Sequence, residues 1–357
     1  MHILIVKVSS LGDIIHTLPA ITDASTMRQD VTFDWVVEEN FAEVPAWHPA
    51  ITNVIPIAAR RWRRNIIKSY FSPEFRTFRN TLKRTRYDLI IDAQGLIKSA
   101  IISRLAKGSS VGLNSRSSRE PLAALFHNKV YSVSTNKHAV ERTRELFAHA
   151  LDYHHHYSHD KLPLDYGIEG IEHEQLQHER PGIMLLHGTT WETKHLPPHY
   201  WRHLAQIAAE AGYDVSLTWG SDTEQQRAEF IAKGNKYVNI LPRQSLSTLA
   251  AHIAQTTGVI TVDTGLGHLA AALGKPTVAL YGPTRPELAG TYGHGQIHLK
   301  STLDCAPCGK RTCGYKGPDL TDTYQNDTFQ IVPPCFSTHK PETVWQQFEK
   351  LLANQNR

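Results

Sequence analysis

The sequence predicts an α/β protein made of two domains, each built on a parallel β-sheet covered by helices. Three observations predict this fold class. The chain has 357 residues, and one domain usually takes roughly 100–200. Short apolar runs alternate with helical patterns in the first half. After a polar interruption at 162–182, which we expect to be a linker, the alternation begins again. Strands that alternate with helices are typical of parallel sheets with crossover connections.

The first half of the chain supplies the elements of the N-terminal domain. The run ILIVKV has the apolar composition of a buried strand, and a helical pattern follows it after a short turn that contains glycine. The expected strands of this half are 3–8, 32–39 and 87–95, and the expected helices are 14–26 and 97–106.

The second half repeats this organisation. Proline stands at the start and glycine at the end of the helix expected at 197–212, which is the usual asymmetry of helix termini. The expected strands are 182–188, 213–220, 258–265 and 276–284, and the expected helices are 197–212, 222–234, 266–274 and 340–355. We therefore predict an N-terminal domain at 1–170, a C-terminal domain at 171–339, and a helix at 340–357 that packs back on the N-terminal domain.

Composition excludes several classes of protein. The net charge is +4 and 41% of the residues are hydrophobic, so a globular protein without a general nucleic-acid partner is expected. No segment reaches the roughly 20 apolar residues that cross a bilayer, and the N-terminus lacks a signal peptide. Four cysteines fit a reducing compartment, so we expect a cytoplasmic protein. The run YHHHYSHD at 153–160 could bind a metal, but consecutive histidines favour a solvated loop.

The stretch 59–86 is rich in arginine and lysine and contains a single acidic residue. Aromatic residues are interleaved with the basic ones; they are Trp62, Tyr70, Phe71, Phe75 and Phe78. This composition suits an anionic surface, such as lipid headgroups or a phosphorylated acceptor. A solvated helix whose basic side chains happen to cluster would have the same composition, so composition alone leaves both possibilities open.

The segment VDTGLGHLAAALG combines the end of a strand, a tight turn and a helix of small residues. We expect the backbone N–H groups of Thr264, Gly265 and Leu266 to lie at the helix N-terminus, where they favour an anion such as a diphosphate. Asp263 can accept a hydrogen bond from a sugar hydroxyl or cap the helix, and His268 lies one turn inside it. An ordinary strand-to-helix turn is the alternative.

A second loop with phosphate-binding chemistry follows the strand expected at 182–188. It carries Thr189, Thr190 and Lys194, and hydroxyl and ammonium donors at the carboxyl end of a strand suit phosphate oxygens. Lys194 can neutralise a leaving diphosphate without a metal ion, or it is an ordinary surface lysine. Glu224, which opens a later helix, can accept from ribose hydroxyls or simply favour the positive end of the helix dipole.

The sequence SSLGD places Gly12 and Asp13 on the turn after the first strand. A G-x-G-x-x-G pattern is absent there, so a Rossmann-type oxidoreductase is not indicated. Asp13 is suited to take a proton from an acceptor hydroxyl as a general base. Helix capping is the ordinary role of such a residue, but the anion site expected in the second half favours the role of base.

Seven segments together resemble the lipopolysaccharide heptosyltransferases, and heptosyltransferase I most closely. They are MHILIVKVSSLGDIIHTLPAITDA, FDWVVEENFAEVPAWHP, IPIAARRWRR, YDLIIDAQGLIKSA, REPLAALFHNK, HAVERTRELFA and VDTGLGHLAAALGKPTVALYGPT. The resemblance runs from residue 1 to about 285. It implies the GT-B fold, in which two Rossmann-like domains face each other across a cleft. It also implies transfer of L-glycero-D-manno-heptose from ADP-heptose to a Kdo sugar of the lipid A inner core, with inversion at the anomeric carbon and without a cofactor or metal.

The resemblance also implies a role for each matching residue. Asp13 matches the general base and Lys194 the diphosphate-binding lysine, so the N-terminal domain would bind the acceptor and the C-terminal domain ADP-heptose. The implied donor-binding residues are Thr189, Thr190, Lys194, Glu224, Asp263, Thr264, Gly265, Leu266, Gly267 and His268. The implied acceptor-binding residues are Lys7, Ser10, Gly12, Arg60, Arg61, Arg63, Gln94 and Arg119. Because lipid A is anchored in a membrane, peripheral contact with the cytoplasmic face of the inner membrane is expected, and the stretch 59–86 would approach that membrane. We expect the protein to be a monomer.

The tail after residue 300 departs from heptosyltransferase I and resembles heptosyltransferase II, because it carries cysteines. They are Cys305, Cys308, Cys313 and Cys335. One C-x-x-C pair among four cysteines could form a structural zinc site, but the other spacings fit no standard finger and favour free thiols. Two alternative functions therefore stay open. One is heptosyltransferase II, which uses a heptose acceptor, and the other is a non-catalytic nucleotide-sugar-binding scaffold.

Overall fold

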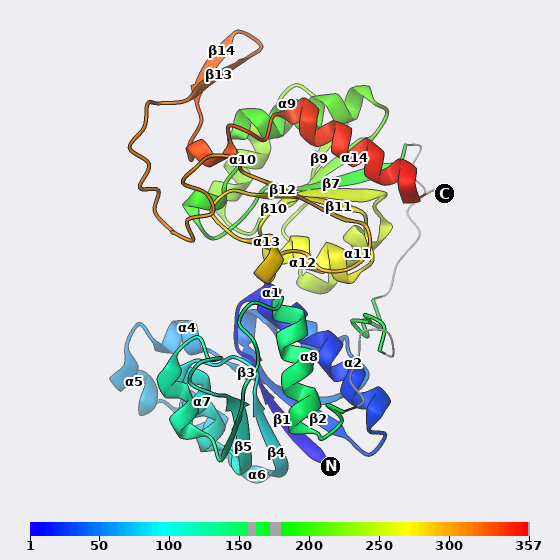
Figure 1. The fold of residues 1–357 in the computed structure, drawn as a ribbon. Helices are drawn as coiled ribbons and strands as arrows, with labels where there is room; N and C mark the ends of the chain where they lie inside the picture. The colour runs from blue at the N-terminus through cyan, green and yellow to red at the C-terminus, as the bar shows by residue number, and fades with distance from the viewer. Residues whose placement is uncertain (156–161, 172–179, 356–357) are drawn as a thin grey trace. The chain divides into compact units, whose positions relative to one another are not determined.

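The chain forms two compact units, Met1–Gly170 and Ile171–Arg357, in a computed structural model that describes residues 1–155, 162–171 and 180–355. Each unit contains a six-stranded sheet whose paired strands are all parallel, with helices packed on it (Figure 1). The predicted α/β class is therefore confirmed. Within the described ranges, no helix is long and apolar enough to cross a membrane. Parts of the linker predicted at 162–182 and of the histidine run at 153–160 lie outside the described residues.

The sheet of the first unit has the strand order β3-β2-β1-β4-β5-β6. Its strands are β1 (His2–Val6), β2 (Thr32–Glu38), β3 (Ile51–Ile57), β4 (Arg86–Asp92), β5 (Lys107–Leu113) and β6 (Lys129–Tyr131). Its helices are α1 (Leu11–Ile15), α2 (Leu18–Met27), α3 (Glu43–Ala46), α4 (Ala59–Trp62), α5 (Ile66–Tyr70), α6 (Pro73–Arg84), α7 (Ile97–Leu105) and α8 (Ala139–Ala150), with 3-10 turns at Glu39–Phe41 and Pro121–Phe126. The order reverses between β1 and β4, and the carboxyl ends of strands at such a point are where α/β sheets bind ligands.

The helix predicted at 14–26 is two helices, α1 and α2, separated at His16 and Thr17. Pro19 explains the break, because it has no N–H to continue the hydrogen bonds of α1 but fits the first turn of α2. The hydroxyl of Thr17 also donates to the backbone oxygen of Asp13 at 2.9 Å. The loop that carries Asp13 is therefore followed by a helix of little more than one turn.

The second unit has the strand order β12-β11-β10-β7-β8-β9, which is the same winding as in the first unit. Its strands are β7 (Gly182–Leu186), β8 (Asp214–Leu217), β9 (Val238–Ile240), β10 (Gly258–Val262), β11 (Thr277–Tyr281) and β12 (Gln296–Lys300), followed by the antiparallel hairpin β13 (Thr321–Tyr324) and β14 (Asp327–Gln330). Its helices are α9 (Pro198–Glu210), α10 (Asp222–Ala232), α11 (Leu246–Gln255), α12 (Gly265–Ala272), α13 (Pro286–Ala289) and α14 (Pro341–Gln355), with 3-10 turns at Glu192–Lys194 and Pro334–Phe336. Here the order reverses between β7 and β10.

The final helix α14 belongs to the second unit, and its packing on the N-terminal domain stays a prediction. It contacts α9, β11 and β12. Val344 and Phe348 are fully buried in the hydrophobic core of this unit, together with Trp345 and Leu351. An amphipathic helix must cover its apolar face, and the open surface of the neighbouring sheet supplies the partner.

Candidate functional site

The carboxylate of Asp263 is the centre of the polar cluster at the switch point of the second unit. Lys194 Nζ lies 2.7 Å from Asp263 Oδ2, and the hydroxyl of Thr284 donates to the same oxygen at 2.6 Å. His268 Nε2 lies 3.7 Å from the other oxygen, Oδ1. Asp263 follows β10, Thr284 follows β11 and Lys194 comes from the loop after β7, so the parallel strands bring these groups to one edge of the sheet.

Burial would raise the pKa of Asp263, but hydrogen bonding to His268 and the charge of Lys194 outweigh it and hold this pKa below its usual value. The carboxylate is therefore ionised at neutral pH. Lys194 is oriented as well, because its ammonium lies 4.5 Å from the centre of the Trp191 ring. The cluster presents a fixed cation beside a fixed anion.

The first turn of α12 lies directly beside this cluster. Thr264 is the N-cap residue, and the N–H groups of Gly265 and Leu266 have no acceptor within the helix because of their position in the first turn. Gly267 packs α12 tightly on β10, since a Cβ there would lie 2.9 Å from the Thr261 methyl carbon. Together with the helix dipole, the turn can hold an anion such as a phosphate. The predicted residues 263–268 thus come together.

The loop after β7 supplies the remaining predicted donor residues. The hydroxyl of Thr189 donates to the backbone oxygen of Asp263 at 3.0 Å, which ties this loop to the end of β10. Thr190 is exposed. Glu224 accepts a hydrogen bond from the Gly220 N–H at 2.8 Å, and a Cβ on Gly188 would lie 2.6 Å from its other oxygen. Its carboxylate therefore covers the end of β7.

The glycine at 188 leaves room for the Glu224 carboxylate, so Gly188→Ala should displace it. Because Glu224 is the predicted partner of the ribose hydroxyls, we expect the KM for the predicted nucleotide-sugar donor to rise roughly tenfold, as for the loss of one hydrogen bond to a charged group. Thermal unfolding should change little because the displaced group is the end of a flexible side chain. Gly220→Ala is the matched control: its Cβ would lie 3.4 Å from Glu224, an ordinary contact. An equal effect of both substitutions would contradict this role of Gly188.

A buried histidine beneath this loop makes the stability of the second unit depend on pH. Burial, with Arg227 and His195 nearby, lowers the pKa of His187 from 6.5 to about 4. The His187 imidazole thus binds a proton more weakly in the folded state than in the unfolded chain. The free energy of unfolding is therefore highest above pH 6.5 and decreases as the pH falls toward 4. In the His187→Phe variant, the decrease in the free energy of unfolding between pH 7 and pH 5 should be about 2 kcal/mol smaller than in the unaltered protein. Denaturant unfolding at both pH values checks this, and an unchanged pH dependence would contradict it.

In the first unit, Asp13 stands at the start of α1, beyond the end of β1. Its Oδ2 accepts hydrogen bonds from the Ser10 N–H at 2.8 Å and the Ser10 hydroxyl at 2.9 Å. No hydrogen bond to its other oxygen, Oδ1, is found over residues 1–155, 162–171 and 180–355. The side chain is half-buried. Asp13 therefore caps its helix with one oxygen and keeps the second for another partner.

The loop 7–13 is held to the end of β4 by two further predicted residues. Gln94 Oε1 accepts from the N–H groups of Val8 (2.8 Å) and Ser9 (3.1 Å), and Gln94 Nε2 donates to the Ser9 oxygen at 2.6 Å. Lys7 is buried and donates to the Ala93 oxygen at 2.8 Å. Burial lowers the pKa of Lys7, although Asp13 and Asp92 oppose this shift. The structure thus gives Gln94 and Lys7 a positioning role, and their predicted contact with an acceptor stays a prediction.

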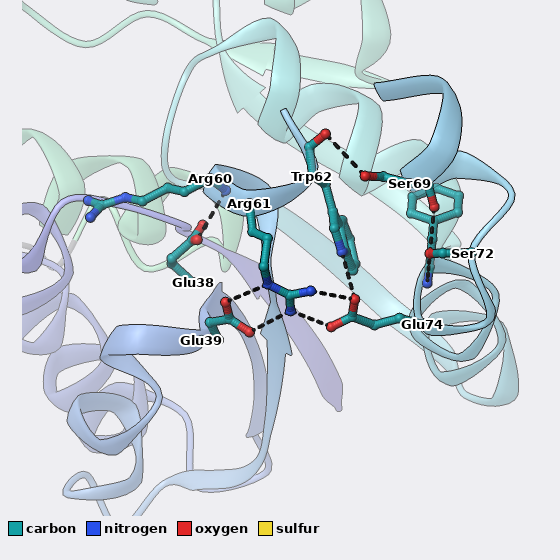
Figure 2. Close-up of polar contacts among 9 residues, drawn as sticks. Glu38, Glu39, Arg60, Arg61, Trp62, Ser69, Ser72 and Glu74 are labelled. Carbon is teal, nitrogen blue, oxygen red and sulfur yellow. Dashed lines mark hydrogen bonds and ion pairs between the residues drawn. The ribbon is translucent and has the colours of Figure 1, made fainter. Parts of the chain in front are cut away.

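The predicted arginines differ in how they are held. Arg60, Arg63 and Arg119 are exposed, and Arg60 lies 5.0 Å from the centre of the Phe41 ring. Figure 2 shows Arg61 between two carboxylates: its guanidinium donates to Glu39 at 3.1 Å and to Glu74 at 2.8 Å. Arg61 is therefore held by two ion pairs, whereas the other three form none within the described ranges of the chain and can meet an anionic ligand there. Gly12 is buried and Ser10 is exposed.

Several residues that contact these sites are not among those that the sequence predicts. Thr284 and Trp191 contact the Asp263–Lys194 pair, and buried Asp92 accepts from the Gln94 N–H at 2.9 Å. Thr284 and Asp92 stand at or just after the carboxyl end of a strand, which was the available signal. Their partners lie far away in the sequence, so the pairing itself leaves no trace in a single sequence.

The four cysteines are free thiols. Cys335 is buried, which raises the pKa of its thiol to about 12, and the other three are exposed. No group of three or more His, Cys, Asp or Glu that could hold a metal ion occurs in the part of the chain that the structure describes. The structure gives no support to the suggested zinc site.

The chain is similar to known proteins over most of its length. The family model of glycosyltransferase family 9 (heptosyltransferase) matches residues 75–318. A Pseudomonas aeruginosa protein named lipopolysaccharide heptosyltransferase 1 is 49% identical over 356 residues, covering 99% of this chain and 98% of that protein. The Escherichia coli K12 protein of that name is 45% identical over 299 residues, covering 83% and 92%. The solved structure of E. coli heptosyltransferase WaaC with ADP has a TM-score of 0.81 at 40% identity, and covers 98% of this chain and 100% of that one.

The comparison with heptosyltransferase II is weaker. The E. coli K12 protein named lipopolysaccharide heptosyltransferase 2 matches at 32% identity over 125 residues, which is 33% of this chain and 36% of that protein. The alignment with the P. aeruginosa protein covers 99% of this chain and so extends through most of the cysteine-bearing tail. The prediction that this tail separates the chain from heptosyltransferase I is therefore wrong. The likeness to WaaC confirms the predicted GT-B fold. The chain belongs to glycosyltransferase family 9, the heptosyltransferases.

Proposed function

We propose that this protein transfers L-glycero-D-manno-heptose from ADP-heptose to a Kdo sugar of the lipid A inner core, with inversion and without a metal ion. The observation that carries the proposal is 49% identity, over nearly the whole length of both chains, to a protein named lipopolysaccharide heptosyltransferase 1. The match to the protein named lipopolysaccharide heptosyltransferase 2 covers only 33% of this chain, which favours Kdo rather than heptose as the acceptor.

The second unit would bind ADP-heptose. The first turn of α12, with the N–H groups of Gly265 and Leu266, would hold the diphosphate. Lys194 would neutralise the charge that develops on the departing ADP. Glu224 would accept from the ribose hydroxyls, and Asp263, ionised and fixed by its neighbours, would accept from a heptose hydroxyl. Thr189, Thr190, Thr264, Gly267 and His268 complete this donor site.

The first unit would bind the acceptor. Asp13 Oδ1 would take the proton from a Kdo hydroxyl, and the resulting oxygen would form a bond to the anomeric carbon while the bond from that carbon to ADP breaks. The electron pair of the broken bond leaves with ADP, and attack from the opposite face inverts the configuration. The exposed arginines 60, 63 and 119 would meet the negative charges of the acceptor. Arg61, Gln94, Lys7, Ser10 and Gly12 would position this surface.

Incubation with ADP-heptose and Kdo–lipid A, followed by mass measurement of the lipid, tests the proposal. We expect the lipid to gain one heptose and ADP to be released. A gain only on an acceptor that already carries heptose would favour heptosyltransferase II. No transfer to either acceptor would favour a nucleotide-sugar-binding scaffold and would contradict the proposal. We further propose that the protein works as a cytoplasmic monomer in peripheral contact with the inner membrane, where such an acceptor is anchored.

A further inference from the structure

Helix α5 presents large apolar side chains to solvent. Ile66, Ile67, Tyr70 and Phe71 are 69%, 76%, 56% and 72% exposed. Their spacing places them along one side of a helical turn, and we call these four residues the α5 ridge. Contiguous exposed apolar groups usually mark a surface that another molecule covers.

Hydrogen bonds hold the segment that carries the α5 ridge in place against its neighbours α4 and α6 (Figure 2). Glu74 accepts from the Arg61 guanidinium at 2.8 Å and from Trp62 Nε1 at 3.0 Å, and so joins α4 to α6. The hydroxyl of Ser69 donates to the Trp62 oxygen at 3.2 Å, and that of Ser72 donates to the Ser69 oxygen at 2.6 Å. These contacts fix α5 relative to its neighbours, so the ridge is held outward by the structure.

A pocket of about 220 Å³ lies at the foot of the ridge. It is lined by Tyr70, Phe71, Phe75, Arg76 and Arg79. The Nε atom of Arg79 is enclosed and has no hydrogen-bond partner within the described ranges of the chain. Arg76 is exposed and Arg79 is half-buried, and the guanidinium group of either suits the oxygens of a phosphate. The pocket therefore has the chemistry of a phosphate site with aromatic walls.

Charge around the ridge indicates the occupant. The stretch 59–86 is basic, and its single acid, Glu74, is already paired with Arg61. A second copy of this chain would bring the same basic surface against this one, and like charges would oppose the contact. Aromatic and aliphatic side chains surrounded by arginine and lysine suit the interface of a bilayer that contains anionic lipids.

We propose that the α5 ridge inserts into the headgroup region of an anionic bilayer while a lipid phosphate occupies the Arg79 pocket. This inference rests on the proposed function, since the acceptor of that reaction is anchored in a bilayer, and it names the part of the chain that makes the contact. The ridge supplies apolar insertion, and Arg76 and Arg79 supply the recognition of negative lipids.

Co-sedimentation with phosphatidylglycerol–phosphatidylethanolamine vesicles and with phosphatidylcholine vesicles tests the proposal. The unaltered protein should bind the anionic vesicles, and binding should weaken with salt. Ile66→Ser/Ile67→Ser should lower the partition coefficient about tenfold or more. Arg76→Gln/Arg79→Gln should lower the preference for anionic lipid about tenfold. The matched control is Leu122→Ser/Leu125→Ser, which changes side chains that are 60% and 80% exposed elsewhere in the same unit and should leave binding unchanged.

Rates of heptose transfer to a soluble and to a vesicle-embedded acceptor distinguish a failure of this inference from a failure of the proposed function. With ADP-heptose and a water-soluble Kdo acceptor, the Ile66→Ser/Ile67→Ser variant should match the unaltered protein, and it should lose activity only on vesicle-embedded Kdo–lipid A. Intact turnover without vesicle binding by the unaltered protein would overturn the inference and leave the proposed function standing. Vesicle binding that all variants keep would also overturn it, as would tight binding of free inorganic phosphate at Arg79 with no binding of vesicles. Ridge-dependent vesicle binding without heptose transfer would support the surface and contradict the function.

Discussion

Replacing Asp13 by asparagine is expected to lower kcat by roughly 10²–10⁴-fold, the usual contribution of a general base. The amide cannot take a proton from the acceptor hydroxyl, but its oxygen can still accept from the Ser10 N–H that Asp13 Oδ2 binds at 2.8 Å. Folding should therefore be nearly unaffected, and the Kd for ADP-heptose should stay the same because the donor residues belong to the second unit. Steady-state release of ADP and calorimetric titration of the donor measure the two quantities.

Asp88→Asn is the matched control for this substitution. Asp88 Oδ2 also accepts one backbone N–H, that of His2, at 2.7 Å, but near the start of β4, at the other end of the strand from Gln94. The kcat of the Asp88→Asn variant should equal that of the unaltered protein. If Asp13→Asn retained more than about a tenth of the original kcat, Asp13 would be a helix cap and nothing more.

Replacing Lys194 by methionine should lower kcat by about 10²–10³-fold, since a positioned cation in an enclosed site stabilises the charge of the departing diphosphate. The Lys194 ammonium is fixed at 2.7 Å from Asp263 and 4.5 Å from the Trp191 ring centre, so its loss removes a preoriented charge. The pKa of Asp263 should rise in the variant, because the charge of Lys194 helps to hold it down. Lys194→Arg keeps the charge and should recover part of the activity.

The control for Lys194 is Lys300→Met. Lys300 forms an ion pair with Glu287 of nearly the same length, 2.6 Å, but both side chains are more than half exposed. An exposed pair contributes about 1 kcal/mol or less to stability, and neither residue is part of the donor site. Equal losses of kcat in the two variants would show that Lys194 acts through folding and would contradict its role at the diphosphate.

The fold could be predicted where strands are buried on both faces. β1, β7, β10 and β11 are nearly continuous apolar runs, and such runs identify central parallel strands. β3 is half exposed and contains Pro56, while β6 and β9 have three residues each, so they give little periodic signal. The partner of α14 could not be predicted, because amphipathicity shows that a helix needs an apolar surface but not which one.

The sequence indicated residues that the structure brings together, but not the contacts that they make there. Asp263 and Lys194 were expected to meet a ligand, and the structure brings them together as an ion pair. Gln94 was expected to contact an acceptor, yet its amide is engaged by Val8 and Ser9, more than eighty positions away. A side chain at the carboxyl end of a strand is marked by its position, but its hydrogen-bond partners depend on which strands become neighbours.

Proton transfer to Asp13 is tested most directly by a structure of the protein in complex with a Kdo acceptor and a non-hydrolysable ADP-heptose analogue. We predict that Asp13 Oδ1 lies about 2.6–3.2 Å from one Kdo hydroxyl. That hydroxyl should lie about 3–3.5 Å from the anomeric carbon, on the face opposite the diphosphate. Another side chain of the protein bonded to that hydroxyl, with Asp13 still occupied only by Ser10, would contradict it.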